Sequence, residues 1–592
     1  MTMPSTPDGT NPFQAAQAQA PLVIGVTGHR DIRKQDREEL QTAIKDIFVE
    51  LKGKYSSTPL ILLSPLAEGT DRLAANVALS QQPQVRLFVP LPMRQTAYEQ
   101  DFQGDSLAEF RDLLGQAEGS LELPLVKGNS SQGILRQGSE RDLQYEGVGK
   151  YIVQKSQILI ALWDGDETDL VGGTASTVKF QREGLPPSEP CSLEAPEGFP
   201  VYHVLTPRVK NPNPRGKPFE RRVLYPNSFR GEEEKARRYY DRMFSRINEF
   251  NRYAGSTDLA LGQEIAKSKL GLLQNLDEKH FAGELRADLN RYGLADALAL
   301  RFQRTKVLTD RFLHGIIFLA FFSFVLFAHL SQHPMFLTLS LVLVMLGGSW
   351  RIAFRKRDGD TKPEDYRAMA EGLRVRFFWR LVGFSDSVTD HYLGKQRTEL
   401  DWIRNGFRGW DVRSELQGNT SDEDLLSTLQ LVKRYWVEEQ QRYFHRASHR
   451  DEDRLKDIEL WGKSLARFAV IVGALLFAVV LYRSMPKLLN HEFFGDYKYE
   501  WIAWPVIFVE AALAGAALLH NYGNVMAYGE HAKQYTRMEG VFSRAAETLK
   551  TRLDNDSGTA LHCISKLGRE ALAENGDWVL LHRERPLEVP HP

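Results

Sequence analysis

The sequence predicts an α/β domain with a doubly wound parallel sheet, followed by an all-α region of transmembrane and cytosolic helices. Three observations support this fold class. Apolar strands alternate with helical segments over the first 207 residues. Four long, almost uncharged apolar runs follow from residue 313 onward. The stretches around those runs are charged and have a helical pattern, so the 592 residues divide into several domains.

The order of these segments predicts the domain organisation. We expect a disordered tail (1–20), a sheet domain (21–207), a linker with a helical stalk (208–305), a transmembrane hairpin (306–357), a cytosolic helical region (358–460), a second transmembrane hairpin (461–523) and a cytosolic C-terminal helical region (524–592).

Composition limits the compartment and the partners. With 75 basic and 76 acidic residues the net charge is −1, so specific nucleic-acid binding is not expected. Only Cys191 and Cys563 are present, which excludes a disulfide framework and favours a reducing compartment. The polar first 20 residues lack the basic and apolar regions of a signal peptide, so the soluble parts should stay cytosolic. No metal-ligand spacing is present, and we expect no metal.

Five strands and two helices are predicted in the sheet domain. The strands are 21–29, 59–67, 85–92, 156–165 and 199–207. Residues 36–55 form an amphipathic helix with its apolar side chains on one stripe, and residues 69–79 form a helix that starts at Thr70. Since apolar, uninterrupted strands are typical of parallel sheets with both faces covered, this alternation predicts a doubly wound sheet.

Distinctive stretches follow four of these strands. They are "GVTGHRD", "SPLAEGTDR", "PLPM" and "WDGDETDLVGGTAS". The ligand crevice of a doubly wound sheet lies beyond the carboxyl ends of its strands, so these loops should converge on one site. The helix start after Gly69 and the Gly172–Gly173–Thr174 turn would offer amide donors to a phosphate.

Charged residues in these loops are candidates for ligand contacts. Arg30 and Arg72 could bind a phosphate, and Asp164 or Glu68 could accept a hydrogen bond from a ribose hydroxyl. A histidine next to this turn, His29, could be an acid–base group or a structural hydrogen-bonding residue.

The same motifs resemble the SLOG superfamily. "GVTGHRD", "LLSPLAEGTDRLAA" and "ILIALWDGDETDLVGGTASTV" are similar to these Rossmann-like domains, which are related to LOG-type nucleotide phosphoribohydrolases and DprA-like proteins; many of them sense nucleotide-derived ligands. The resemblance covers residues 21–207. It implies a nucleotide or nucleotide-sugar site at Gly25, Thr27, Gly28, His29, Arg30, Glu68, Gly69, Asp71, Arg72, Gly172, Gly173 and Thr174.

One departure from the enzyme pattern affects the expected activity. LOG-type hydrolases carry a Pro-Gly-Gly-x-Gly-Thr-x-x-Glu signature, whereas "VGGTASTV" lacks the second glycine step and has Val178 instead of an acid after the threonine turn. We therefore expect binding rather than hydrolysis, assign no catalytic residue and expect no required cofactor.

The apolar runs predict two transmembrane hairpins. Residues 313–330 and 335–350 form one pair, and residues 466–482 and 501–519 form the other. Each run approaches the roughly 20 residues that cross a bilayer. Any single run could instead be a buried helix of a large soluble protein. Because the cations flank the outer ends of the hairpins, both termini should be cytoplasmic.

The fourth run contains two unusual residues. Pro505 lies one turn after its start, and Glu510 lies near its middle. A carboxylate at the bilayer centre is costly, so Glu510 should face a helix or water. It could line a pore or make a structural hydrogen bond to a neighbouring helix.

The remaining segments have no specific motif. Residues 208–230 are predicted to be an irregular connector, whose arginines could contact lipid headgroups, nucleic acid or solvent. Residues 364–384 and 528–549 are predicted to be amphipathic helices that could pack against each other.

The domain combination resembles the SLOG-linked SLATT-type modules of bacterial conflict systems. "YRAMAEGLRVRFFW" and "LGREALAENGDWVLLHRERPLEVP" carry this similarity, whereas two hairpins in place of one depart from the simplest version. The resemblance implies a bacterial inner-membrane effector that becomes active when its sensor is occupied.

Three functions remain open. The first is a homo-oligomeric membrane effector that is gated by a nucleotide-derived ligand. The second is a membrane-anchored enzyme that processes a nucleotide, with phosphoribohydrolase-like or NAD-hydrolase-like activity; His29, Asp31 or Glu68 would be its acid–base candidates. The third is a structural membrane protein whose sheet domain recruits a partner.

Overall fold

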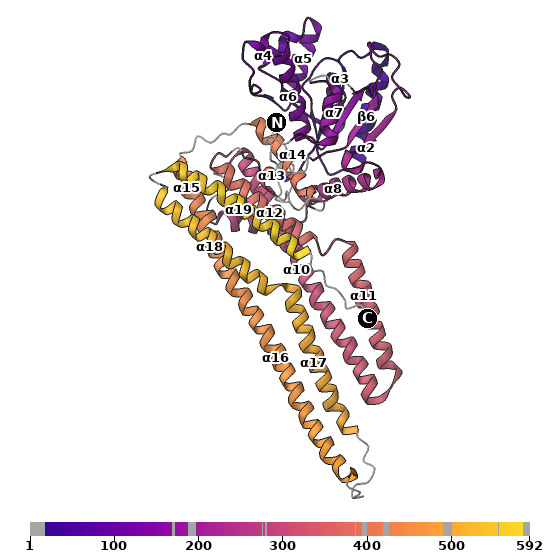
Figure 1. Ribbon diagram of the computed structural model, residues 1–592, viewed down its shortest axis with the longest axis vertical. Coiled ribbons are helices and arrows are strands. Elements are labelled where there is room, and N and C mark those ends of the chain that lie inside the picture. Colours follow the sequence, from indigo (N-terminus) through magenta and orange to yellow (C-terminus); the bar gives the residue numbers. More distant parts are fainter. Residues whose placement is uncertain are drawn as a thin grey trace. The chain divides into compact units, whose positions relative to one another are not determined.

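A computed structural model describes most of the chain and divides it into two compact units. The described residues are 18–167, 172–186, 197–274, 276, 278, 281–384, 386–392, 400–417, 425–488, 500–553 and 556–583. Unit 1 takes its residues from 1–263, 279–294 and 383–422, and unit 2 takes the remainder of the chain (Figure 1). Unit 1 contains the sheet and unit 2 is largely helical, so the predicted fold class is confirmed at this level.

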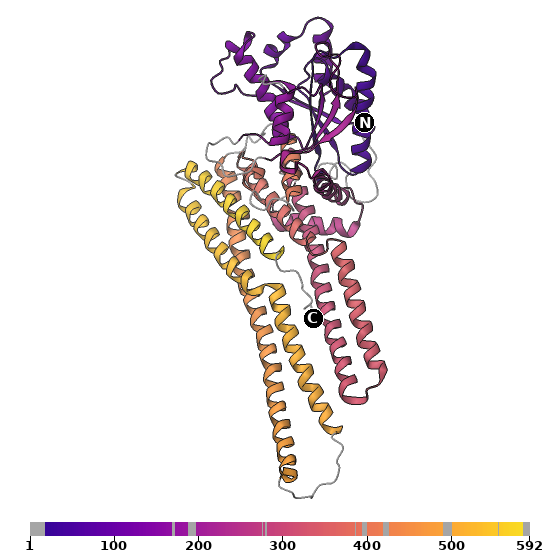
Figure 2. The same cartoon turned by 45° about the vertical axis from the view of Figure 1, so that its right-hand side comes forward.

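Unit 1 is built on a sheet of seven strands in the order β4-β3-β2-β1-β5-β6-β7. Part of this sheet is visible in Figure 2. The strands are β1 (Leu22–Gly28), β2 (Leu60–Leu63), β3 (Arg86–Leu91), β4 (Gly119–Glu122), β5 (Ile158–Trp163), β6 (Val201–Leu205) and β7 (Arg221–Leu224). All neighbouring pairs are parallel except β6 and β7, which are antiparallel.

The strand order reverses beside β1. From β1 the chain builds outward through β2, β3 and β4, and then returns to place β5 on the opposite side of β1. Gly28 of β1 is in register with Leu162 of β5, so both strands end at the same edge. This edge is the topological switch point, where open α/β sheets bind ligands.

The five predicted strands are all present, and two further strands were not predicted. Strand β4 has an alternating half-exposed pattern, and β7 begins with two exposed arginines. Both lie at the outer edges of the sheet, where polar side chains face solvent and the apolar signal is weak. Strand β7 lies inside the segment predicted to be an irregular connector, so that prediction is wrong for residues 221–224.

Helices cover both the sheet and its edges. Unit 1 contains α2 (Arg37–Lys54), α3 (Thr70–Leu79), α4 (Gln95–Tyr98), α5 (Asp105–Gln116), α6 (Ser139–Lys155), α7 (Thr174–Glu183), α8 (Glu233–Ala254), α13 (Val388–His391), α14 (Asp401–Gln417) and the first residues of α10 (Gly283–Leu326). One core cluster joins strand residues to Ile152 of α6, Val178 of α7 and Val412 of α14. Helix α14, distant in sequence, is therefore part of the core of the sheet unit.

The described chain begins in contact with unit 1. The backbone of Ala20 exchanges hydrogen bonds with the side chain of Asn251, at 2.7 and 2.8 Å. The indole of Trp410 donates to the carbonyl of Gln19 at 2.9 Å. Residues 18–20, predicted to belong to a disordered tail, are thus anchored to the sheet unit; residues 1–17 of that tail lie outside the described residues.

Unit 2 contains the helices that were predicted to enter a membrane. Its helices are α9 (Leu259–Leu273, shared with unit 1), the larger part of α10, α11 (Pro334–Lys356), α12 (Lys362–Leu381), α15 (Leu425–Val432), α16 (Glu438–Leu488), α17 (Glu500–Met526), α18 (Tyr528–Arg552) and α19 (Ser557–Arg583). Four helical stretches are long and apolar enough to cross a membrane, and they contain the four predicted runs. Hairpin 1 (α10 and α11) and hairpin 2 (α16 and α17) are visible in Figure 2.

The packing of the other helices in unit 2 differs from the prediction. Helix α12 pairs mainly with α19, and α18 pairs mainly with α16 and α19. Helix α12 is buried on nearly all sides. Its charged side chains can be buried because they form ion pairs: Glu371 contacts Arg367 at 2.7 Å and also contacts Arg374. The expected amphipathic contact between residues 364–384 and 528–549 is therefore not the main contact.

Candidate functional site

The loops after β1, β2 and β5 meet at the carboxyl edge of the sheet. The amide of His29 donates to the carbonyl of Leu162, and the amide of Thr70 donates to the carbonyl of His29, both at 3.3 Å. Two glycines allow this approach. A Cβ on Gly28 would lie 2.7 Å from the Leu162 carbonyl oxygen, and one on Gly69 would lie 2.6 Å from the Arg30 carbonyl oxygen. These glycines bring the loops together.

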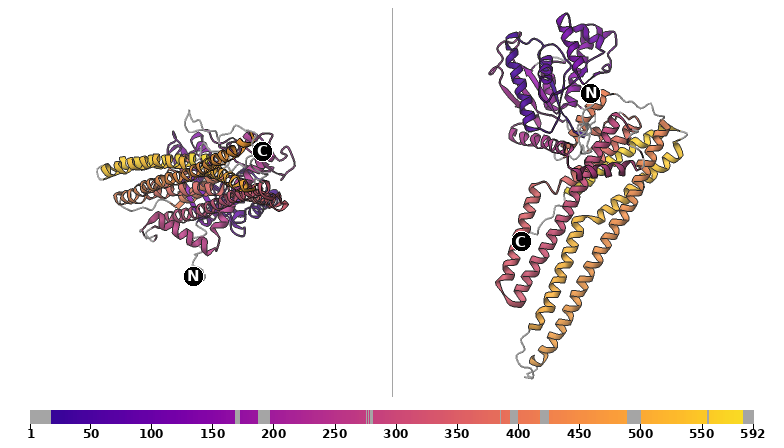
Figure 3. Two further views of the ribbon diagram at one scale, coloured as in Figure 1. Left: turned by 90° about the horizontal axis from the view of Figure 1, so that it is seen from below. Right: turned by 180° about the vertical axis from the view of Figure 1, so that it is seen from behind.

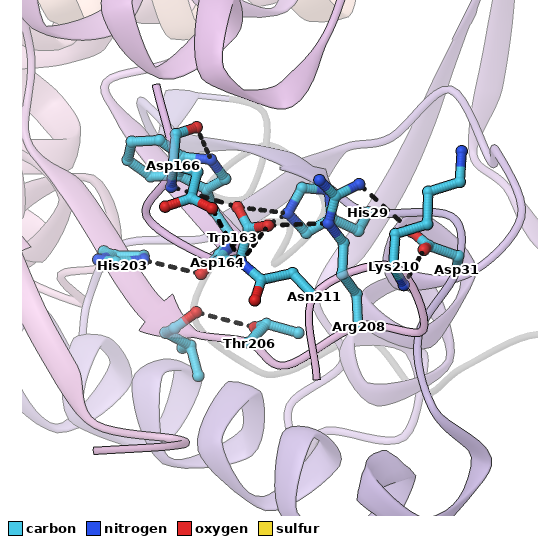
Figure 4. A network of polar contacts seen from close by, with 11 residues as sticks. His29, Asp31, Trp163, Asp164, Asp166, His203, Thr206, Arg208, Lys210 and Asn211 are labelled. Carbon is cyan, nitrogen blue, oxygen red and sulfur yellow. Dashed lines mark hydrogen bonds and ion pairs between the residues drawn. The ribbon is translucent and has the colours of Figure 1, made fainter. Parts of the chain in front are cut away.

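His29 lies against Asp164 at the junction of β1 and β5 (Figure 4). Its Nε2 atom is 3.1 Å from Oδ1 of Asp164 and 3.2 Å from the Asp164 backbone nitrogen. Burial lowers the pKa of His29, although the Asp164 carboxylate opposes this shift. The imidazole is therefore mainly neutral at pH 7.

A segment after β6 completes this network. Arg208 Nε lies 2.8 Å from Asp164 Oδ2, and Asn211 donates to the same oxygen at 3.2 Å (Figure 4). Asp31 accepts from the backbone nitrogens of Val209, through its carbonyl, and of Lys210, through its carboxylate, at 2.9 and 3.1 Å. This segment thus ties the loop after β1 to the loop after β5.

Asp164 is enclosed by these contacts. Its side chain is only 1% exposed, and both of its oxygens have protein partners. Burial would raise its pKa, but His29, the Asp166 amide, Asn211 and Arg208 together hold the pKa below its usual value. In this conformation the carboxylate orders three loops, and the hydrogen bond to a ribose hydroxyl stays a prediction.

Arg30 follows His29 at the same edge. Its side chain is exposed, and its guanidinium lies 5.2 Å from the ring centroid of Tyr145 on α6. It makes no ion pair with any described residue. The nearby Asp71 is 6% exposed; burial raises the pKa of its carboxyl to about 7, although Arg30 and the Ala67 amide lower it. Arg30 therefore keeps a charge that a ligand can reach.

Tyr145 is held by a polar cluster. Its hydroxyl donates to Asp101, and Arg141 lies 2.8 Å from the same carboxylate. Burial and Asp101 raise the pKa of Tyr145 to about 12, so the phenol remains protonated. The ring is thus fixed beneath the Arg30 guanidinium.

The Gly172–Gly173–Thr174 turn lies beside the same tyrosine. A Cβ on Gly172 would lie 3.1 Å from the backbone nitrogen of Glu146 and 3.4 Å from Cβ of Tyr145. Helix α7 begins at Thr174, so its first amides lie at this turn. The predicted turn and Arg30 therefore both lie beside Tyr145.

Three other predicted ligand residues lie against neighbouring protein groups. Arg72 is 1% exposed, donates to the Leu66 and Ser106 carbonyls at 3.0 and 2.7 Å, and stacks on Phe102. Glu68 accepts a hydrogen bond from the hydroxyl of Ser106. Gly25 faces α6, where its Cβ would lie 3.0 Å from the Ser156 hydroxyl.

Two predicted residues are less informative. Thr27 is partly buried in β1, and Thr70, the first residue of α3, is buried and follows the N-cap residue Gly69. A cavity of about 540 Å³ lies in unit 2 and is lined by Lys433, Arg442 and Lys550 among others, far in sequence from the sheet.

Sequence reasoning missed four residues of this edge. Arg208 and Asn211 follow β6, so the same rule about strand ends that selected the other loops would have found them. Tyr145 and Arg141 share one face of α6 at a spacing of four, but no strand end marks them.

The predicted membrane acid has a partner in unit 2. His329 Nε2 lies 3.2 Å from Oε1 of Glu510, which joins the end of hairpin 1 to the middle of α17. Pro505 lies inside α17, which continues through it. This contact corresponds to the helix-to-helix hydrogen bond that was one of the two expectations for Glu510.

Comparison with protein-family models and with curated proteins finds no match for this chain.

Proposed function

We propose that this protein is a membrane effector whose sheet unit binds a nucleotide-derived ligand and whose apolar helices form or gate a pore. The observation that carries this proposal is Arg30. It is exposed at the switch point and lies over the ring of Tyr145, which also lies beside the glycine turn before α7. An exposed guanidinium and the first amides of a helix are suited to a phosphate or another anion.

Binding is favoured over bond cleavage by the state of the acid–base candidates. Asp31 and Asp164 bind neighbouring loops, Glu68 accepts from Ser106, and His29 lies against Asp164. These groups hold the carboxyl edge together. Contacts that hold loops together suit a sensor. A ligand shifts the equilibrium between two conformations only when it binds one of them more tightly, and loops ordered by such contacts can provide that difference.

The apolar helices support the membrane part of the proposal. Only 6% of the most apolar stretch, on α16, is buried by protein. Such a surface needs lipid or further protein to cover it. Four helices enclose little space on their own, so we propose that the pore is a homo-oligomer in a bacterial inner membrane, with both termini in the cytoplasm.

The His29–Asp164 pair supports a second candidate, a membrane-anchored nucleotide-processing enzyme. A neutral imidazole next to a carboxylate can accept a proton from a substrate or water. In this candidate the ligand is consumed, whereas in the effector it is released unchanged.

Dye leakage tests the proposal. Full-length protein in liposomes is challenged with mono-, di- and cyclic nucleotides and dinucleotide metabolites. We expect one ligand to cause leakage, and Arg30→Ala to raise the concentration for half-maximal leakage about 10- to 100-fold, the loss of one charged hydrogen bond. The matched control is Arg221→Ala, which removes an exposed arginine of edge strand β7 and should leave leakage unchanged.

Consumption of the ligand is measured in the same samples by chromatography. Leakage without consumption supports the effector. Consumption without leakage, lost in His29→Gln, would establish the enzyme instead, and neither response to any panel member would contradict both.

A further inference from the structure

The two helices of hairpin 2 set a common depth scale. In this pair, a Cβ on Gly515 would lie 3.4 Å from Cδ1 of Leu465, and one on Gly523 would lie 3.4 Å from Cγ2 of Ile458. Because the helices run antiparallel, a residue further along α17 faces a residue correspondingly earlier in α16, and the residue numbers of each facing pair have nearly the same sum. Glu510 of α17 therefore lies level with about residue 471 of α16.

The end of hairpin 1 lies at this same level. Helix α10 ends in a π-helical turn (Phe327–Ser331), Gln332 adopts φ of 48°, and α11 starts at Pro334. His329 in this turn lies 3.2 Å from Glu510. Figure 3 shows hairpin 2 continuing well beyond the end of hairpin 1.

The overhang is apolar. Beyond Glu510, α17 continues to Glu500 and α16 continues past Tyr482. At 1.5 Å per residue, the ten residues from 510 to 500 extend about 15 Å, roughly half of a bilayer core. Phe477 on α16 and Phe508 on α17, both within the overhang, are 69% and 55% exposed. The two hairpins therefore cannot both span the same flat bilayer in this conformation.

Hairpin 2 is the better candidate to span. The most apolar stretch of α16 is 6% buried by protein, whereas that of α10 is 28% buried. A helix with more protein around it needs less lipid. We propose that hairpin 1 ends at the middle of the bilayer, where its turn, His329 and Glu510 form a hydrated polar site. This inference rests on the proposal that hairpin 2 crosses a membrane.

Water is the ligand that this site requires. The turn has polar backbone groups that no lipid can satisfy, and His329 and Glu510 are 33% and 37% exposed. A carboxylate at this depth is tolerated only with a partner or water. The site would therefore place water at half depth beside α17.

Spin-label depth measurements test this placement. In a Cys191→Ser, Cys563→Ser background, single cysteines replace Gln332 at the turn, Ile471 at the level of Glu510, and Tyr482 near the far end of the apolar run. All three side chains are exposed. The full-length protein is reconstituted in phosphatidylethanolamine and phosphatidylglycerol vesicles, and depth is read from the relaxation effects of oxygen and a nickel chelate.

We expect the Gln332 label at the depth of the Ile471 label, about 16 Å from that of Tyr482. Deuterium modulation in heavy water should be stronger at Gln332 than at Ile471. A Gln332 label level with Tyr482 would overturn the inference and leave the membrane proposal intact. An Ile471 label in bulk water would instead overturn the membrane proposal, and equal deuterium signals would overturn the hydrated site.

Two variants test the contact itself. Glu510→Gln can still hydrogen-bond His329, so the Gln332 label should keep its depth. Glu510→Leu cannot, so the label should move toward the depth of Tyr482. An unchanged depth in Glu510→Leu would show that another contact holds the turn.

Discussion

The carboxyl of Asp71 is influenced by the charge of Arg30 in the candidate site. The carboxyl of Asp71 is buried at the start of α3, and its pKa is raised to about 7 because burial disfavours its charged form. Arg30 lowers this pKa, so the protonation of Asp71 depends on the position of the Arg30 charge. A bound anion that draws Arg30 away should raise the pKa further.

The raised pKa predicts a pH dependence of stability. The folded protein binds the Asp71 proton more tightly than the unfolded chain, whose carboxyl titrates near 3.8. The stabilising effect is thus complete below about pH 4 and is lost as the pH rises to about 7. In urea titrations, Asp71→Asn should therefore gain stability relative to the native protein between pH 5 and pH 8.

The control for this titration is Asp46→Asn, which changes a side chain that is 53% exposed. Its stability difference should be flat over the same pH range. A flat difference for Asp71→Asn would contradict the raised pKa.

Gly69 occupies a backbone position that only glycine can adopt without strain. Its φ of +86° is unfavourable for any side chain, and a Cβ would collide with the backbone of His29 and Arg30. We expect Gly69→Ala to lower the free energy of unfolding of unit 1 by at least about 2 kcal/mol, measured by chemical denaturation.

Gly53→Ala is the matched control, because Gly53 lies in α2 with no atom near the position of a Cβ. This substitution should stabilise the protein by about 0.5–1 kcal/mol. Equal effects of the two substitutions would contradict the role of Gly69.

At the scale of elements, α14 is the helix that completes the sheet unit. Trp410 is fully buried, donates to the Gln19 carbonyl, and lies 5.2 Å below the guanidinium of Arg291. Gln157, at the start of β5, donates to the Asn405 carbonyl at 2.9 Å. Helix α14 is thus integral to unit 1, although nearly 200 residues separate it from β6.

Replacement of Trp410 measures this contribution. Trp410→Ala removes a buried indole and should cost unit 1 about 3–5 kcal/mol. For a unit of this size, the loss corresponds to a decrease in Tm of about 10 °C. Differential scanning calorimetry of the detergent-solubilised protein gives the measurement.

Trp461→Ala serves as its control, since that indole is 65% exposed on α16. The melting transition of the sheet unit should not move in this variant. A similar decrease in both proteins would show that Trp410 contributes nothing specific to the unit.

At the scale of the whole molecule, each unit is assembled from separate stretches of chain. Unit 1 takes residues before 264, the stretch 279–294 and the stretch 383–422. Helix α10 is continuous through the change from one unit to the other. Truncation after the predicted sheet domain would therefore remove core residues of unit 1, and the full chain is the suitable object for functional work.

Much of the fold could be predicted because its signals are local. Nearly uninterrupted apolar runs form the strands β1, β2, β3, β5 and β6. The four apolar helical runs are long enough to cross a membrane, a length that is unusual for helices of soluble proteins. The edge strands β4 and β7 were missed because their side chains face solvent.

The candidate site could be predicted only in part. The loops after β1, β2 and β5 were placed correctly at one edge, because the carboxyl ends of parallel strands lie at the same edge of the sheet. Which side chains face outward there is a separate question. Arg30 is exposed, whereas Arg72, an equally good candidate by sequence, is buried against Phe102.

The sequence by itself determined the parallel sheet, the edge at which the candidate site lies and the four apolar helices, because strand period, strand order and hydrophobic length are properties of neighbouring residues. Only the tertiary structure decided that α14 belongs to the sheet unit, that Tyr145 lies beneath Arg30, and that hairpin 1 ends level with Glu510. These contacts join residues far apart in the chain, where packing and charge pairing choose among partners that look alike in sequence.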